Sequence, residues 1–117
     1  MSRSTLGHGR IELGEASDEE ISLFQRPLPG TAADTLSGWH LIAVRRPVDR
    51  RLQLVVAGTS DRTRRWWLSS PLLALDGLRM ARTVHGRLYA LGVRSLEDAD
   101  DATVARVRQA LSRAGRL

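Results

Sequence analysis

The chain has 117 residues, which is the size of a single domain with one hydrophobic core. Its 42% hydrophobic and 26% charged residues are ordinary for a globular protein. The absence of cysteine excludes disulfides and thiolate metal sites, and it fits a reducing compartment. Residues 1–10 have no signal-peptide pattern, and no apolar run is long enough to cross a membrane. The sequence therefore predicts a cytoplasmic protein without a membrane partner.

Arginine alone supplies the positive charge, because all 18 basic residues are arginine and the net charge is +5. A GC-rich bacterial genome accounts for such a bias. The charge is concentrated in the middle of the chain: residues 31–60 carry four arginines and two acids, and residues 61–94 carry seven arginines and two acids. Arginine binds phosphate and carboxylate with two parallel hydrogen bonds and stacks on aromatic rings. The centre of the chain is therefore the region to search for a binding site.

Residues 1–38 are predicted to form an arm, a short helix and a linker. Ser17 and Glu20 have the spacing of a capping box, and apolar residues follow them. We therefore expect a short helix over about residues 18–25. Two prolines and a glycine end this helix, so residues 27–38 are predicted to be a linker.

Residues 39–117 are predicted to form one compact domain. Its centre has short segments rich in valine, isoleucine and leucine between turn residues, the pattern of an antiparallel β-meander. The expected strands are 39–45, 51–57, 64–69, 72–75, 79–83 and 88–91. Apolar residues of segment 78–91 also recur at helical spacing. Gly86 costs about 1 kcal/mol relative to alanine inside a helix, however, so strands are favoured there.

The end of the chain has the pattern of an amphipathic helix. Its apolar face is predicted to consist of Val104, Val107, Leu111 and Ala114. Arg106 and Arg113 are expected on the opposite face, and Gly115 is placed to cap the C-terminal end. The predicted fold is α+β: a small antiparallel β-meander or barrel-like sheet with this C-terminal helix and the short N-terminal helix.

Residues 69–72, 82–83 and 89–92 read Ser-Ser-Pro-Leu, Arg-Thr and Tyr-Ala-Leu-Gly. This pattern resembles the ending of a class of short, uncharacterised bacterial proteins, and the likeness covers about a quarter of the chain. The resemblance implies a single compact module. It implies no chemistry, because that class has no established function.

Catalytic patterns are missing from the chain. The three histidines, His8, His40 and His85, are isolated from other metal ligands at the usual spacings. The serine pair at residues 69–70 lacks the glycines of a nucleophile elbow. The glycine pair at residues 7–9 lacks the rest of a dinucleotide fingerprint. We therefore expect a protein that is not an enzyme and that uses no cofactor or metal.

The arginine-rich centre is the candidate binding site. If the meander is correct, its arginines converge at the ends of the sheet and form a positive patch that attracts phosphates. A solvated surface of arginines is the alternative interpretation. The candidate phosphate-binding residues are Arg45, Arg46, Arg50, Arg51, Arg62, Arg64 and Arg65.

Trp66 and Trp67 are adjacent, so in a strand their side chains point to opposite faces. One indole can enter the core, and the other is either exposed or covered by the C-terminal helix or the N-terminal arm. An exposed indole beside arginines suits base stacking or a protein interface, and stacking of an arginine on the indole is a third arrangement. The sequence thus favours a non-enzymatic module that binds or regulates DNA or RNA. The alternative is a protein-interaction module: a phage- or plasmid-type adaptor, an inhibitor or a homodimer.

Overall fold

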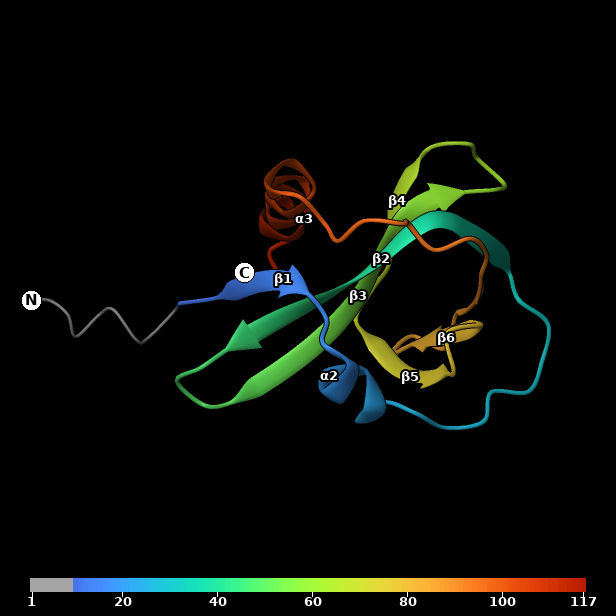
Figure 1. Ribbon diagram of the computed structural model, residues 1–117, viewed down its shortest axis with the longest axis horizontal. Coiled ribbons are helices and arrows are strands. Elements are labelled where there is room, and N and C mark those ends of the chain that lie inside the picture. Colours follow the sequence, from blue (N-terminus) through green and yellow to red (C-terminus); the bar gives the residue numbers. More distant parts are fainter. Residues whose placement is uncertain (1–9) are drawn as a thin grey trace, which may run out of the picture.

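The structure is a computed structural model that describes residues 10–117, and these form a seven-stranded mixed sheet with two helices (Figure 1). The strands are β1 (Glu12–Glu15), β2 (Asp34–Arg46), β3 (Arg51–Ser60), β4 (Trp66–Leu68), β5 (Leu72–Asp76), β6 (Met80–Thr83) and β7 (Leu88–Leu91). The helices are α2 (Asp18–Ser22) and α3 (Asp101–Arg113). The predicted α+β class and the two strands within residues 78–91 are confirmed. Predictions for residues 7–9, including His8, lie outside the described residues.

The strand order β4-β3-β2-β7-β6-β5 corrects the predicted meander. Successive strands pair antiparallel in two groups, β2–β3–β4 and β5–β6–β7. The two groups are joined by a parallel pairing of β7 with β2, whereas β4 and β5 lie at opposite ends of the order. Local turns specify each hairpin, but the pairing of β2 with β7 joins segments more than 50 residues apart. The sheet is open and does not close into a barrel.

Both faces of β2 and β3 are buried, because successive apolar residues of these strands point to opposite faces and pack into two separate clusters. One cluster contains Leu41 and Leu54 and is completed by Ile21 of α2 and by Tyr89. The other contains Ile42 and is covered by α3. Figure 1 shows α3 and α2 on either side of the long β2–β3 hairpin.

Part of the N-terminal segment belongs to the sheet, whereas only an arm, a short helix and a linker are predicted there. Ser17 caps α2, since its hydroxyl accepts from Glu20 N at 3.1 Å and Glu20 Oε1 accepts from Ser17 N at 3.0 Å. Strand β1 pairs with residues 42–45 of β2. The linker predicted over 27–38 is shorter, because β2 begins at Asp34.

Helix α3 begins at the cap residue Asp100, whose carboxylate accepts from Thr103 N at 2.8 Å. Val107 and Leu111 are buried against the sheet, as the amphipathic pattern predicts. Ala114, however, is exposed at the C-terminal cap. Among residues 10–117, neither helix combines the length and apolar character needed to cross a membrane.

Candidate nucleic-acid interface

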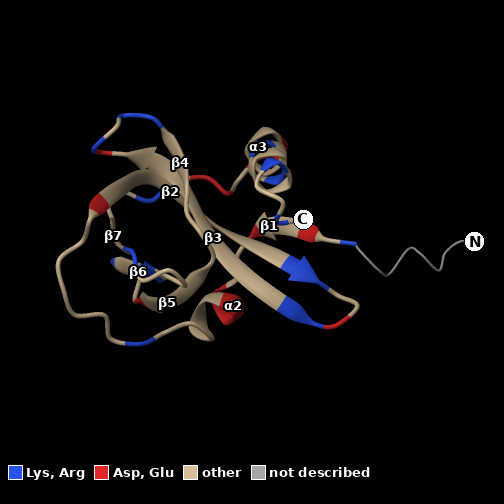
Figure 2. Cartoon of the chain, turned by 180° about the vertical axis from the view of Figure 1, so that it is seen from behind, with Lys and Arg blue, Asp and Glu red and all other residues tan. Residues whose placement is uncertain are grey.

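The structure divides the seven candidate arginines between the two ends of β3. Arg45, Arg46, Arg50 and Arg51 lie at the β2–β3 turn, where β3 begins. Arg62, Arg64 and Arg65 lie in the loop that follows the other end of β3. A ten-residue strand spans about 30 Å at roughly 3.3 Å per residue. Figure 2 shows the two basic regions far apart, so the predicted convergence into one patch is wrong.

Arg45 stabilises the fold instead of facing a ligand. Its guanidinium donates to both carboxylate oxygens of Glu20 at 2.7 Å and to the carbonyl of Glu15 at 3.1 Å. The hydrogen bond from Arg45 lowers the pKa of the Glu20 carboxyl from 4.5 to about 2. A half-buried arginine engaged in this way is not free to contact phosphate.

Arg46 is also paired, but Arg50 and Arg51 are not. Arg46 donates from Nε and Nη2 to the two oxygens of Asp49, at 3.2 and 2.5 Å. Arg50 and Arg51 are exposed and form no ion pair with any residue from 10 to 117. The β2–β3 turn therefore carries less available charge than its four arginines suggest.

The loop between β3 and β4, residues 61–65, is held by a dense set of hydrogen bonds to its backbone. Asp34 organises one side: it accepts from the Ser60 hydroxyl at 2.5 Å and from Arg62 N at 3.2 Å. Within the loop, Arg64 N donates to Ser60 O at 2.8 Å, and Ser60 N donates to Arg65 O at 2.9 Å. These bonds fix the backbone from which the arginine side chains project.

Asp34 is suited to this anchoring role because it stays ionised. Burial raises the pKa of its carboxyl, but the hydrogen bonds from the Ser60 hydroxyl and the backbone N–H groups of Thr35 and Arg62 outweigh this effect and lower the pKa below 3.8. No local pattern indicates this role, since Asp34 is 26 residues from Ser60.

The three arginines of this loop, Arg62, Arg64 and Arg65, are all exposed. They form no ion pair with any residue from 10 to 117. Arg64 has a φ of 62°, in the left-handed region that non-glycine residues seldom occupy. The loop thus presents three guanidinium groups from a fixed backbone, and we call this group the loop arginines.

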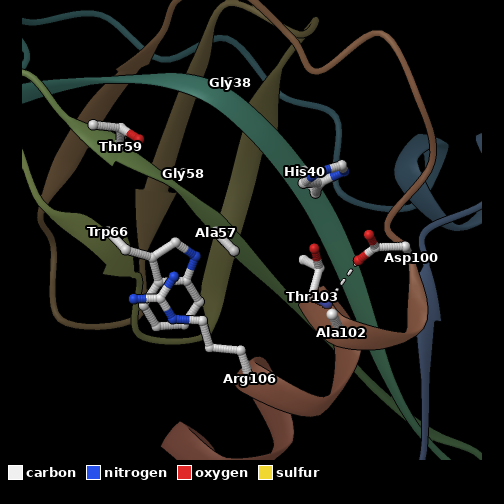
Figure 3. A pocket seen from close by; sticks show the side chains of 10 residues that line it. All are labelled: Gly38, His40, Ala57, Gly58, Thr59, Trp66, Asp100, Ala102, Thr103 and Arg106. Carbon is white, nitrogen blue, oxygen red and sulfur yellow. Dashed lines mark hydrogen bonds between the residues drawn. The ribbon is translucent and has the colours of Figure 1, made fainter.

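Trp66 and Trp67 follow the loop and point to opposite faces, as expected for neighbours in a strand. Trp66 packs against the cluster under α3, and the Arg106 guanidinium lies 4.3 Å from the centroid of its ring. Figure 3 shows this stacking. Arg106 is exposed, as predicted for the polar side of α3, but its guanidinium reaches the indole, so the arginine-on-indole arrangement applies to Trp66.

Trp67 is the exposed member of the pair, with 37% of its surface accessible. Its Nε1 donates to the hydroxyl of Tyr89 at 3.0 Å, while the ring of Tyr89 is buried. This hydrogen bond fixes the orientation of the indole without covering it. Trp67 therefore offers a positioned aromatic surface on β4, directly after the loop arginines.

A hollow of about 290 Å³ lies between the start of α3 and the sheet (Figure 3). His40, Asp100 and Arg106 contribute polar groups to its wall, together with the Trp66 ring. His40 Nδ1 lies 3.3 Å from Glu15 Oε1, and Glu15 Oε1 also accepts from Ala99 N at 2.8 Å. Sequence reasoning missed this grouping, because its members, from Glu15 to Arg106, are up to 91 positions apart. Residues 10–117 contain no cluster of three side chains suited to a metal ion.

Comparisons with protein-family models, with curated proteins and with solved structures find no match to this chain.

Proposed function

We propose that the chain binds single-stranded nucleic acid, DNA or RNA, through the loop arginines and the exposed ring of Trp67. The observation that carries this proposal is the hydrogen-bonded β3–β4 loop, which presents three exposed arginines that form no ion pair within residues 10–117, beside a positioned indole. The role is binding, with no catalytic step.

The loop arginines supply the electrostatic part of the affinity. Each guanidinium can donate two parallel hydrogen bonds to a phosphate. Because hydrogen bonds already fix the loop backbone, binding loses less conformational entropy than it would with a disordered loop. Neutralising three phosphates gives a log–log salt slope of about −2, at roughly 0.7 per phosphate of a single strand.

Trp67 supplies the preference for single strands. Base stacking on an aromatic side chain contributes about 1–3 kcal/mol per base and tolerates any sequence. An unpaired base is free to reach the exposed indole, whereas a base in a duplex is already stacked. The Trp67 hydrogen bond to Tyr89 keeps the ring in place before binding.

The test is fluorescence anisotropy of a labelled oligothymidylate titrated with two triple variants that have the same net charge. R62Q/R64Q/R65Q removes the loop arginines, and R26Q/R50Q/R79Q removes three exposed arginines elsewhere; each lowers the net charge from +5 to +2. We expect the loop variant to weaken binding by about tenfold or more, and the control to retain most of the affinity. Equal losses in the two variants would refute a localised site.

Replacing Trp67 separates nucleic-acid binding from the protein-interaction alternative. W67A should weaken binding of a single strand by about 1–3 kcal/mol and leave duplex affinity unchanged. If the wild-type chain has no affinity for nucleic acid, and W67A instead changes the mass measured by light scattering, the indole anchors a protein contact and the proposal is wrong.

A further inference from the structure

A second basic site lies at the other end of β3, next to the C-terminal end of α3. It is a hollow of about 60 Å³ lined by Ile11, Val44, Arg46, Arg51, Gln53 and Arg116. Three of these six residues are arginines, and none is acidic. The position of each arginine follows from the fold.

The sheet register places Arg46 directly opposite Arg51. Like charges that face each other across a strand pair are unfavourable. Asp49 in the connecting turn offsets part of this repulsion, because it pairs with Arg46 and accepts from Arg51 N at 3.2 Å. One carboxylate therefore neutralises one of the two guanidinium groups, and the side chain of Arg51 keeps its full charge.

The turn at the C-terminal end of α3 brings Arg116 to the hollow that Arg46 and Arg51 line. Gly115 has a φ of 70°, a left-handed conformation that residues with a side chain seldom adopt. Directly after it, Arg116 N donates a hydrogen bond to Leu111 O at 2.9 Å. This turn directs the chain back toward the sheet. The Nη2 atom of Arg116 is buried and has no hydrogen-bond acceptor among residues 10–117.

The surroundings of Arg116 favour an anionic ligand. Burial lowers the pKa of its guanidinium, since no acid within the described chain compensates for the lost hydration. Arg116 is half-buried as a whole, but its buried Nη2 donor lacks a partner within the described residues, and leaving such a donor unpaired is costly unless an oxygen acceptor is supplied. The hollow has room for roughly four waters at about 15 Å³ each. That space suits a tetrahedral oxyanion and is too small for a nucleobase.

We propose that Arg46, Arg51 and Arg116 form a binding site for a phosphate group. Arg116 and Arg51 donate to its oxygens, and Arg46 contributes the N–H groups that Asp49 leaves free. The group comes either from inorganic phosphate or from the terminal phosphate of a nucleic-acid strand, since the recognised chemistry is the same. The site is separate from the loop arginines, and it does not depend on the nucleic-acid proposal.

Thermal melting of the full chain tests the site, in buffers of equal ionic strength with sodium phosphate or sodium chloride. We expect phosphate to raise the Tm of the wild-type chain and of R113Q, a variant with the same charge change at the same end of α3. The phosphate-dependent rise should disappear in R116Q and in R51Q. Arg51 is exposed, so R51Q tests the proposal even if R116Q folds poorly.

Three results would overturn the proposal: no phosphate-dependent rise in the wild-type chain, an undiminished rise in both R116Q and R51Q, or an equal loss of the rise in R113Q. A second titration, with 5′-phosphorylated and 5′-hydroxyl oligonucleotides, distinguishes inorganic phosphate from the terminal phosphate of a strand as the ligand. A preference for the phosphorylated strand that R116Q abolishes assigns the site to strand ends. Equal affinities, together with the phosphate-dependent rise, assign it to free phosphate.

Discussion

Truncation of Leu111 tests whether α3 is an integral part of the fold. Leu111 is only 2% exposed and packs in the cluster that α3 shares with β2 and β3, next to Val107. L111A removes buried methyl groups and leaves a cavity between helix and sheet. Substitutions of this kind cost about 2–5 kcal/mol in the free energy of unfolding.

This cost converts into a large change in melting temperature. With an unfolding entropy of about 2.1 cal/mol/K per residue, a 117-residue chain loses roughly 4 °C for each kcal/mol. L111A should therefore lower the Tm by about 8–20 °C, measured by circular dichroism at 222 nm. The matched control is L96A, because Leu96 is fully exposed and its truncation changes stability by less than about 0.5 kcal/mol.

Equal melting temperatures for L111A and the wild-type chain would refute the packing of α3 on the sheet. A large loss in L96A would instead contradict the exposure of Leu96, and that variant would then not serve as the control.

Two further perturbations test other contacts of the fold. The pKa of Glu20 is lowered from its ordinary value of 4.5 to about 2 in the folded state, chiefly by the hydrogen bond from Arg45. This pair therefore stabilises the protein above pH 4.5, and its contribution is lost as the pH falls toward 2. E20Q should cost about 1.5–3 kcal/mol at pH 7 and flatten the pH dependence of stability between 4.5 and 2, measured by urea unfolding; an unchanged pH profile would contradict the pairing. G58A should lower stability by roughly 1–3 kcal/mol, because the added Cβ would lie 3.1 Å from Trp39 Cβ and from a backbone oxygen; wild-type stability in the same assay would show that the packing there can yield.

The parts of the fold that sequence reasoning identified are those specified by neighbouring residues. Helix α3 follows from the helical spacing of Val104, Val107 and Leu111, which lie within eight positions of one another. The hairpins follow from turn residues between apolar segments. The parallel pairing of β2 with β7 has no such local signal, because parallel strands are joined by long connections whose course depends on the whole core.

The candidate site was only partly predictable for the same reason. Adjacent positions establish that Trp66 and Trp67 face opposite ways, but they do not show which indole is covered. The partners that decide this, Arg106 and Tyr89, are 40 and 22 positions away. Likewise, whether Arg45 is free to bind a ligand depends on its pairing with Glu20, which is 25 positions away in the sequence.

Whether the loop arginines bind nucleic acid is tested by the salt dependence of oligonucleotide binding by the wild-type chain. Affinity for a labelled single strand is measured by fluorescence anisotropy from about 20 to 200 mM NaCl, the range in which phosphate contacts dominate. We expect measurable binding at the lowest salt and a log–log slope of about −2, reduced toward zero in R62Q/R64Q/R65Q. An absence of binding to DNA and RNA at the lowest salt, or a slope that the loop substitutions leave unchanged, would contradict it.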